Sequence, residues 1–371
     1  GLYGTKQAAR LWHATFKNHL LADGWIPYES DPCLFSRRTK KFGLEFFGMY
    51  VDDGIHLCSN QAAHTSLIDY FKTKFPTESQ GPLKWILKCN VTRDRTNKSL
   101  WLDQSRSIKD FLSTWKITRS SNPPNAPMSS SWQYGTDEAI TDPAKITEYR
   151  SKVSSLSYFV QVTRPDLAFA VNSLSRWMHK PNPACFQALD DVCSYLHAHS
   201  DIGLHYTAPR SARIHAFADA SWAGPDSIQA KSVTGNLIFH GNDLISWESS
   251  LQKATPALSP AEAEFNSAFE AARTLVYTGM LFDELGYPQI EPALIYEDNT
   301  ACIQQAKHPV NFKRSRHINL RYHYMRELTG TNQIDMQYVP TAHQLADALT
   351  KPLPGPQFQK LTAHFMQRCP H

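Results

Sequence analysis

The sequence lacks three features that would place it in a familiar class: paired cysteines, long apolar runs and a strong charge of one sign. Its seven cysteines are scattered without a Cys-x-x-Cys pair, which argues against a zinc module or a disulfide framework and favours a reducing, intracellular setting. No apolar run reaches the length of a membrane span, and no secretory leader is visible, so we expect no membrane partner. The formal net charge of +4 is mild, so a nucleic-acid surface would have to be local.

Core-forming residues, in contrast, are plentiful. The chain has 371 residues, of which 42% are hydrophobic and 12% aromatic, enough for packed cores in two or three domains. It begins at Gly1, without a methionine and inside a segment with structured character. We therefore expect it to be a piece of a longer product.

The first two thirds of the chain predict mixed α/β structure followed by helices. Residues 8–22 carry apolar side chains at helical spacing, and two apolar runs flank Asp52-Asp53-Gly54, which is typical of a hairpin. A short helix over 103–113 and a proline-rich linker over 122–127 follow. Three further helices, interpreted as packed helices without chemistry, are predicted over 148–161, 165–178 and 183–197.

From about residue 211 the pattern changes to short strands around a long helix, predicted over 261–285. A mixed five-stranded sheet flanked by helices accounts for this order, giving the last part of the chain an α/β (α+β) fold. The strands are expected over residues 214–217, 232–239, 244–247, 293–296 and 334–338.

Four acidic residues of this region are each expected in a segment that can deliver them to one metal site. Asp219 and Asp298 are predicted at the ends of two strands, the edge where open α/β sheets bind ligands. Glu264 lies on the long helix, and Asp347 on a short helix near the end of the chain. Acid clusters of this kind hold a pair of divalent ions against a phosphodiester, one activating water and the other supporting the leaving oxygen.

The long helix offers two candidate ligands, Glu262 and Glu264. Ser259-Pro260-Ala261-Glu262 is a capping box, in which the Glu262 carboxylate bonds back to the Ser259 backbone. Glu264 lies about 200° further around the helix and therefore faces another way. We favour Glu264 as the ligand, and the choice stays open at this level.

Two further features near these acids bear on nucleic acid. The segment from residue 304 to residue 326 carries cations without an acid among them, which indicates a track for phosphates. Its candidate nucleic-acid-binding residues are Lys313, Arg314, Arg316, His317 and Arg321. His343 lies in a loop beside the fourth acid and is a candidate auxiliary residue for proton transfer or product release, although we favour its interpretation as a solvated loop histidine.

Several sequence words resemble the Pol polyprotein of copia-type LTR retrotransposons, from the middle of the reverse transcriptase to the end of RNase H. They recur in order along nearly the whole chain. The words are Leu2-Tyr-Gly-Thr-Lys-Gln-Ala-Ala-Arg-Leu-Trp, Tyr50-Val-Asp-Asp, Thr163-Arg-Pro-Asp-Leu-Ala-Phe-Ala-Val-Asn, Ala218-Asp-Ala-Ser-Trp-Ala-Gly, Ser232-Val-Thr-Gly, Ile245-Ser-Trp, Leu258-Ser-Pro-Ala-Glu-Ala-Glu-Phe, Glu297-Asp-Asn, Arg314-Ser-Arg-His-Ile and Ala346-Asp-Ala-Leu-Thr-Lys-Pro-Leu.

The resemblance implies a domain plan. It places the remainder of a reverse-transcriptase palm and the start of the thumb in residues 1–122, a helical thumb or connection in 123–208, RNase H in 209–355 and a tail in 356–371. It further implies that Asp52 and Asp53 are polymerase carboxylates that bind metal, and that Lys6 and Gln7 lie where template and nucleotide bind.

The resemblance also implies the chemistry and the partners. The RNase H would cut the RNA strand of an RNA–DNA hybrid, with two Mg²⁺ ions (Mn²⁺ substituting) held by a metal site of the DEDD type. Those four acids fall on Asp219, Glu264, Asp298 and Asp347. Template RNA and primer are the other expected partners, and a cytoplasmic particle or the nucleus is the expected location.

Departures from the family pattern leave alternatives. The family's first polymerase aspartate would precede residue 1, so we expect no polymerisation by the chain as given. Residues 84–90 differ from the Leu-Gly-Ile turn that is usual in the family, and Asn319 replaces an acid. Glu248 lies in a motif that is usually basic, and this change would weaken hybrid binding. A non-catalytic nucleic-acid-binding remnant of a decayed element is therefore the alternative. An integrase is weaker, because its third acid would follow the second by roughly 35 residues.

Overall fold

The computed structural model describes residues 5–134, 137–207, 213–222, 231–253, 256–308 and 316–370, and for residues 316–319 the backbone alone. The chain divides into two compact units. The first comprises Gly1–Leu83 with Tyr277–Pro288, and the second comprises Lys84–Val276 with Gln289–His371. Among the described residues, no helix combines the length and the hydropathy that crossing a membrane requires.

The first unit is an antiparallel sheet covered by two helices. Helix α1 (Lys6–Ala22) begins at Thr5, whose hydroxyl accepts the Ala8 N–H, and helix α2 (Gln61–Lys72) follows the sheet. Phe16, Leu20 and Trp25 pack with aromatic residues of the sheet and of α2 to form the core. The four strands, in spatial order, are β1 (Ile26–Pro27), β2 (Leu34–Thr39), β3 (Gly43–Tyr50) and β4 (Asp53–Leu57).

The predicted hairpin around Asp52-Asp53 is the connection of β3 and β4. Tyr50 pairs with Asp53, which leaves Val51 and Asp52 as a two-residue turn. Val51 has a φ of 57°, in the left-handed region, and its carbonyl accepts the Trp12 indole N–H at 2.8 Å. Both aspartates are exposed.

The second unit contains a sheet that the sequence patterns did not predict. Its spatial order is β14-β8-β7-β6-β5, all antiparallel where the pairs are described. Helix α3 (Ser105–Thr114) follows β7 along the chain. The strands are β5 (Trp85–Ile86), β6 (Cys89–Asp94), β7 (Ser99–Asp103), β8 (Ile202–Thr207) and β14 (Gln367–Arg368).

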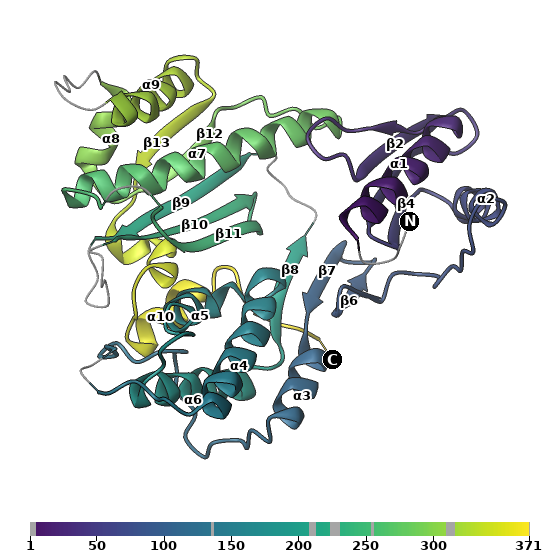
Figure 1. The fold of residues 1–371 in the computed structure, drawn as a ribbon. Helices are drawn as coiled ribbons and strands as arrows, with labels where there is room; N and C mark the ends of the chain where they lie inside the picture. Colours follow the sequence, from purple (N-terminus) through teal and green to yellow (C-terminus); the bar gives the residue numbers. More distant parts are fainter. Residues whose placement is uncertain are drawn as a thin grey trace. The chain divides into compact units, whose positions relative to one another are not determined.

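The predicted mixed five-stranded sheet flanked by helices is confirmed. Its spatial order is β11-β10-β9-β12-β13, with β9, β10 and β11 antiparallel and with β12 parallel to both β9 and β13. Figure 1 shows the long helix α7 (Pro260–Glu284) along this sheet. The strands are β9 (Ile214–Ser221), β10 (Val233–His240), β11 (Asp243–Leu251), β12 (Ala293–Glu297) and β13 (Ile334–Tyr338).

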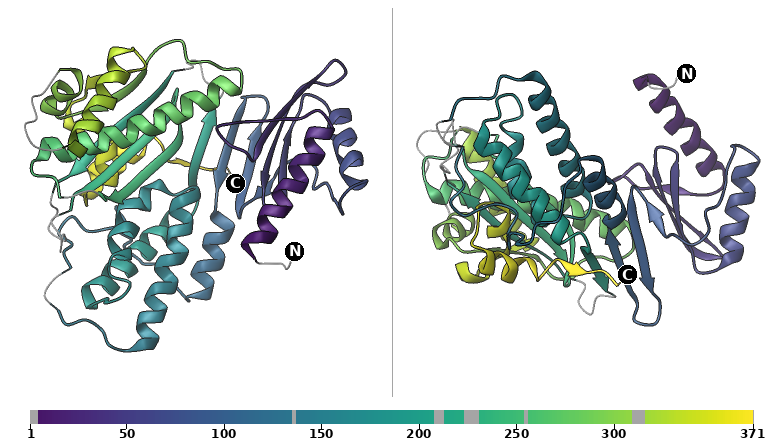
Figure 2. Two further views of the ribbon diagram at one scale, coloured as in Figure 1. Left: turned by 45° about the horizontal axis from the view of Figure 1, so that its top comes forward. Right: turned by 90° about the horizontal axis from the view of Figure 1, so that it is seen from below.

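Both faces of this sheet are buried, as the alternation along β10 shows. Asn236 faces α7, where its side-chain oxygen accepts the Ser267 hydroxyl at 3.1 Å, whereas Val233, Leu237 and Phe239 face the opposite way into the main core. That core includes side chains of the helices seen below the sheet in Figure 1 and in the left view of Figure 2. They are α4 (Pro143–Val162), the 3-10 helix η1 (Pro165–Leu167), α5 (Ala168–Ser175) and α6 (Pro183–Ala198).

The remaining helices lie between the last two strands of the sheet or after them along the chain. Helices α8 (Thr300–Lys307) and α9 (Arg316–Gly330) connect β12 to β13. After β13 come the 3-10 helices η2 (Thr341–His343) and η3 (Leu345–Leu349) and then helix α10 (Gly355–Thr362). Asp347 therefore lies in a short helix, as predicted, and this helix is of the 3-10 type. Thr350 and Lys351 both donate their N–H to the Asp347 carbonyl at 3.3 Å, which closes this turn tightly.

A buried ion pair fixes the junction between α4 and α5. The Arg164 guanidinium, 0% exposed, donates to both carboxylate oxygens of Asp166 at 2.9 and 2.7 Å and to the His199 carbonyl at 2.9 Å. The Tyr195 hydroxyl donates to the same carboxylate at 3.1 Å. Removing one partner would leave the other buried charge uncompensated.

We expect Asp166→Asn to lower the free energy of unfolding by about 3–5 kcal/mol, because it leaves the Arg164 charge buried without its counter-charge. Urea unfolding measures this change. Asp201→Asn is the matched control, because it breaks an ion pair with Arg368 that is largely exposed. That control should cost at most about 1 kcal/mol. Equal losses in the two variants would contradict the importance of the buried pair.

Candidate metal centre

Three acidic side chains converge at one edge of the five-stranded sheet. Asp219, Glu264 and Asp298 each offer a carboxylate oxygen, and these oxygens all lie within 4.8 Å of one another. They come from β9, from α7 and from the residue that follows β12. Within the described parts of the chain, this is the one group of three or more His, Cys, Asp or Glu residues close enough to hold a metal ion.

Strand register explains why the two aspartates meet. Strands β9 and β12 are parallel neighbours, and Phe217 pairs with Tyr296. Asp219 and Asp298 each lie two residues beyond this pair, so they reach the same level on adjacent strands, which are separated by about 4.8 Å. Asp219 lies inside β9 rather than at the predicted strand end, because β9 continues to Ser221 through its pairing with Val233.

The helix contributes Glu264 and not Glu262. The Glu264 carboxylate accepts the Ala220 N–H at 2.6 Å, so the residue after Asp219 anchors it beside the aspartates. Glu262 instead caps the helix: its carboxylate accepts the Leu258 N–H at 2.8 Å, one residue earlier than we predicted, and its own N–H donates to the Ser259 hydroxyl. The two carboxylates therefore have different partners, because their side chains leave the helix about 200° apart.

Asp347 joins the site from η3. Its carboxylate lies 2.8 Å from the Lys351 Nζ, and the same ammonium lies 3.7 Å from Asp219. Asp219 also accepts the Thr350 hydroxyl, and Asp298 accepts the Thr341 hydroxyl at 2.7 Å. Each of the aspartates is thus held by a hydroxyl or an ammonium from the segment after β13.

Burial makes this cluster electrostatically unfavourable without a cation. Asp219 and Asp347 are 1% exposed and Glu264 is 8% exposed. Burial, reinforced by Asp219 and the neighbouring acids, raises the pKa of Glu264 to about 11. Burial and then Asp219 raise the pKa of Asp347 to about 7, and burial also raises the pKa of Asp219 against the opposing effect of Lys351. A cation among these oxygens would favour their ionised forms.

Glu297 is a buried acid of this region that the sequence patterns did not single out. It is 0% exposed, one of its oxygens accepts the Asn299 N–H at 3.1 Å, and burial raises its pKa well above the ordinary value. Its charge contributes to the raised pKa of Glu264. Its position directly before Asp298, at the end of a buried strand, could have indicated that Glu297 is a buried acid near the site.

The donor set fits a hard divalent cation. All the candidate ligand atoms are carboxylate oxygens, without a sulfur or an imidazole nitrogen among them. Mg²⁺ and Mn²⁺ prefer such ligands, whereas zinc sites are built from cysteine and histidine. Three close acids at a sheet edge, with a fourth in η3, therefore suit Mg²⁺ better than zinc.

The other predicted site residues lie elsewhere or outside the described residues. Lys6 and Gln7 are exposed in the first turn of α1, in the first unit with Asp52 and Asp53. His343 is exposed in η2, close in sequence to Thr341. Lys313 and Arg314 lie outside the described residues, as do the side chains of Arg316 and His317.

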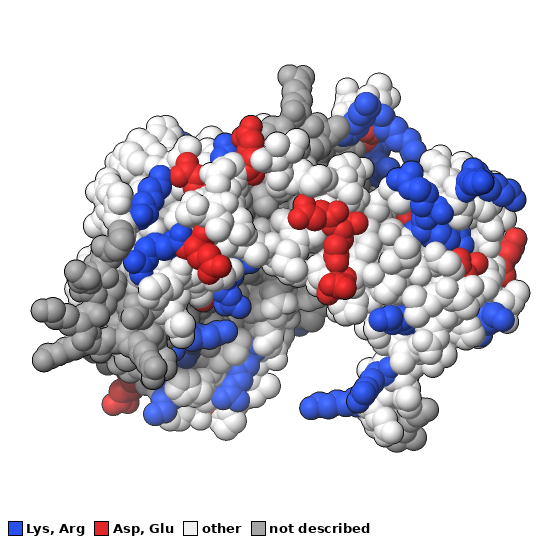
Figure 3. Space-filling model, turned by 90° about the horizontal axis from the view of Figure 1, so that it is seen from above, with Lys and Arg blue, Asp and Glu red and all other residues white. Residues whose placement is uncertain are grey.

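Arg321 of the predicted phosphate track is bound to α7. Its guanidinium donates to the Asn266 side-chain oxygen at 2.6 Å and lies 5.5 Å from the centre of the Phe269 ring. On the face drawn in Figure 3, the described lysine and arginine side chains stand in small separate groups among neutral residues.

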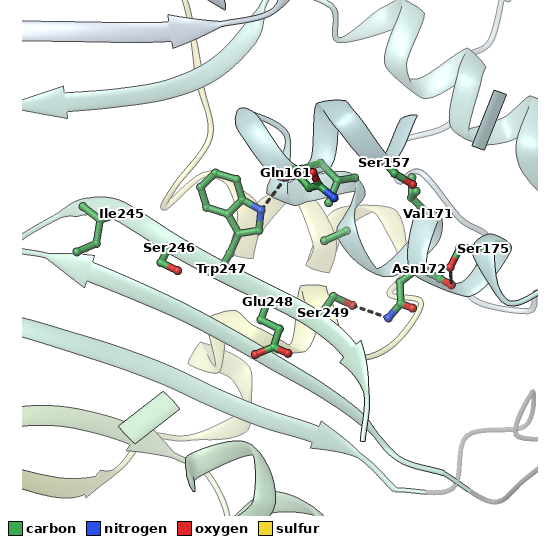
Figure 4. Close-up of a pocket in the computed structure, with 12 residues that line it drawn as sticks. Ser157, Gln161, Val171, Asn172, Ser175, Ile245, Ser246, Trp247, Glu248 and Ser249 are labelled. Carbon is green, nitrogen blue, oxygen red and sulfur yellow. Dashed lines mark hydrogen bonds between the residues drawn. The ribbon is translucent and has the colours of Figure 1, made fainter. Parts of the chain in front are cut away.

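A cavity of about 470 Å³ lies where α4 and α5 meet the edge strand β11 (Figure 4). The Trp247 indole donates to the Val160 carbonyl at 2.7 Å, and the Asn172 amide donates to the Ser249 hydroxyl at 3.3 Å. Glu248, which lies in a motif that is usually basic in the family, borders this cavity and accepts the Ser250 hydroxyl at 2.6 Å. These contacts join the helices to the sheet through polar groups.

No family model matches the chain. It is 32% identical over 364 residues to the retrovirus-related Pol polyprotein from transposon RE1 of Arabidopsis thaliana, an alignment covering 98% of this chain and 24% of that protein. The chain thus spans about a quarter of the length of the curated relatives it matches.

The solved structures that are similar to the chain include a foamy viral reverse transcriptase and an RNase H1. The foamy viral protease-reverse transcriptase in complex with RNA/DNA hybrid is 13% identical with a TM-score of 0.49, covering 91% of this chain and 39% of that one. The LC11 RNase H1 isolated from compost is 15% identical with a TM-score of 0.29, covering 38% of this chain and 93% of that one. Likenesses this weak do not by themselves establish a function.

Proposed function

The chain belongs to the family of retrotransposon Pol polyproteins, and we propose that its β11-β10-β9-β12-β13 sheet carries a ribonuclease H that hydrolyses the RNA strand of RNA–DNA hybrids. One observation carries this proposal: Asp219, Glu264 and Asp298 bring their carboxylate oxygens within 4.8 Å of one another at the edge of the sheet. The strand order and the family support the same activity.

Asp219, Glu264, Asp298 and Asp347 would hold two Mg²⁺ ions, for which Mn²⁺ can substitute. When bound, such ions supply activation of the attacking water and charge stabilisation for the leaving oxygen of the phosphodiester. Carboxylate oxygens are the ligands that both ions prefer, which is the chemical fit on which this assignment depends.

The chain's own residues keep the ligands in place. The Ala220 N–H holds one oxygen of Glu264, and the Thr341 hydroxyl holds one oxygen of Asp298, so neither carboxylate has to be ordered when the substrate arrives. Asp298 is half-buried whereas Asp219 and Asp347 are buried, so Asp298 is the aspartate that a substrate reaches most directly. The buried positions of the other acids keep water from screening their charges.

Selectivity for a hybrid would rest on duplex shape and on contacts to the 2′-hydroxyls rather than on base identity. Primer and template RNA would be the further partners of a reverse-transcriptase part that includes Asp52 and Asp53. We propose that this hairpin does not polymerise by itself, since no third acid groups with its two aspartates within the described residues.

Asp298→Asn should reduce cleavage of an end-labelled RNA–DNA hybrid in Mg²⁺ by at least about 100-fold, because it removes a ligand charge from the centre of the cluster. The measurement is the rate of RNA cleavage in the hybrid, with single-stranded RNA as the substrate control. Asp335→Asn is the matched variant, because Asp335 lies on β13 in an ion pair with Lys307 and outside the cluster.

The outcomes separate the candidate functions. RNA cleavage in the hybrid by the wild type and by Asp335→Asn, but not by Asp298→Asn, supports the ribonuclease and its site. Unchanged turnover in Asp298→Asn would contradict the site assignment. A folded wild type that binds the hybrid without cutting it would favour the non-catalytic remnant.

A further inference from the structure

Lys351 places a positive charge inside the cluster of acids. Its Nζ lies 2.8 Å from an oxygen of Asp347 and 3.7 Å from an oxygen of Asp219. Both aspartates are buried, with 2% of each side chain exposed, whereas the lysine side chain is 36% exposed. The ammonium therefore approaches the acids from the solvent side.

The chain holds this lysine in position through its backbone. The Lys351 and Thr350 N–H groups both donate to the Asp347 carbonyl at 3.3 Å, so lysine and aspartate leave opposite ends of one tight turn. Thr350, directly before the lysine, donates its hydroxyl to Asp219. Two successive residues thus bind the two buried aspartates, one through a hydroxyl and one through an ammonium.

We propose that Lys351 is a built-in counter-cation, which holds Asp219 and Asp347 while no metal is bound and competes with metal ions for their oxygens. This rests on the proposed function for the identity of the metal ligands. Asp347 and Asp219 are the two acids that the lysine contacts, and they are also two of the four candidate ligands. A bound divalent ion would displace the ammonium toward solvent, which the flexible four-carbon side chain of lysine permits.

The proposal has two consequences. The first would also be expected of a purely structural ion pair, whereas the second would not. Removing the lysine charge should destabilise the metal-free protein, because the buried aspartates lose their counter-charge. It should also strengthen metal binding, because a competing positive charge disappears from the ligands. A unit charge a few ångströms from the ligands, partly screened by solvent, gives a change of roughly 5- to 50-fold in affinity.

Lys351→Gln in the full chain tests the proposal, with Mn²⁺ as the probe and calorimetry as the measurement. The Kd for Mn²⁺ should fall roughly 5- to 50-fold relative to the wild type. Lys307→Gln is the matched control: its Nζ also lies 2.8 Å from an aspartate, Asp335, and its side chain is 38% exposed, but it lies outside the cluster. Lys351→Arg keeps the charge and should bind Mn²⁺ nearly as the wild type does.

Thermal unfolding supplies the second readout. In EDTA, Lys351→Gln should melt below the wild type, and saturating Mn²⁺ should close this difference, because the metal then supplies the counter-charge. Lys307→Gln should show no such dependence on metal.

These outcomes decide the inference separately from the proposed function. Wild-type cleavage with equal Mn²⁺ affinity in Lys351→Gln overturns the role of the lysine and leaves the ribonuclease standing. If Lys351→Gln binds Mn²⁺ while the wild type neither binds it nor cleaves the hybrid, the competing role of Lys351 is supported and the ribonuclease activity is contradicted. Failure of both proteins to bind Mn²⁺ overturns the inference.

Discussion

A chain that begins at residue 209 should fail to fold, whereas a chain that begins at Lys84 should unfold cooperatively. The reason is the core that the sheet shares with helices α4–α6. Val233, Leu237, Phe239 and Leu244 are buried in one cluster with side chains of these helices, and Trp247 packs against that cluster. Starting at residue 209 would remove these helices from this face of the sheet and leave only the residues of η3 and α10 to cover it.

The size of the effect follows from the exposed area. Each of these side chains contributes about 1.5–3 kcal/mol when fully buried. The four buried ones, without Trp247, together contribute about 6–12 kcal/mol, which approaches the whole stability of a domain, about 5–15 kcal/mol. The polar contacts from Trp247 to the Val160 carbonyl and from Asn172 to Ser249 would be lost as well.

Circular dichroism and urea unfolding of the two shortened chains measure this difference. The chain from Lys84 keeps every residue of the second unit and is therefore the matched control. A cooperative transition in the chain from residue 209, at the urea midpoint of the longer chain, would show that the sheet does not need the helices.

The five-stranded sheet was predictable because its signals are local. Short β-branched and aromatic runs mark its strands, and the capped, alanine-rich helix between them is long enough to identify without its partners. The end of β9 was less predictable: Ala218-Asp219-Ala220 contains no strong strand formers, and its extended form comes from pairing with β10.

The sheet β14-β8-β7-β6-β5 was missed because its strands are far apart in sequence. Strand β8 pairs with β7, about a hundred residues earlier, and with β14, a strand of two residues near the end of the chain. A two-residue strand has no periodicity to detect. We predicted a domain boundary between residues 208 and 209 because the sequence pattern changes there. One hydrophobic core nevertheless contains side chains from both sides of this position.

The four candidate ligands could be predicted from sequence motifs, but the residues that hold them in place could not. Lys351 and Thr350 lie in the motif that supplied Asp347, but the sequence patterns gave them no role, and their contacts to Asp219 span more than 130 positions along the chain. Such contacts depend on how η3 packs against β9, which no local pattern encodes. The sequence therefore identifies the acids, whereas the structure identifies what holds them.

Glu264→Gln should stabilise the metal-free protein while it abolishes cleavage. Burial and the neighbouring acids raise the pKa of Glu264 to about 11, so this carboxyl stays protonated at neutral pH when no cation is bound. A raised carboxyl pKa contributes stability that is complete below the unfolded pKa, about 4.3, and that is lost as the pH rises toward the folded value. Glutamine has the shape of the protonated acid and does not ionise in the unfolded chain, so it avoids this loss.

The expected gain in the free energy of unfolding in EDTA is up to about 5 kcal/mol at pH 8 and at most about 1 kcal/mol at pH 5. The Ala220 N–H can still donate to the side-chain oxygen of glutamine, so the local structure should persist. Urea unfolding at the two pH values measures the gain, and Glu262→Gln, which alters only the helix cap, is the control. A Glu264→Gln protein that is less stable at pH 8, or that still cuts the hybrid at the wild-type rate, would contradict the assignment. On the proposed function, the acid that holds the metal is thus the same acid that destabilises the fold when the metal is absent.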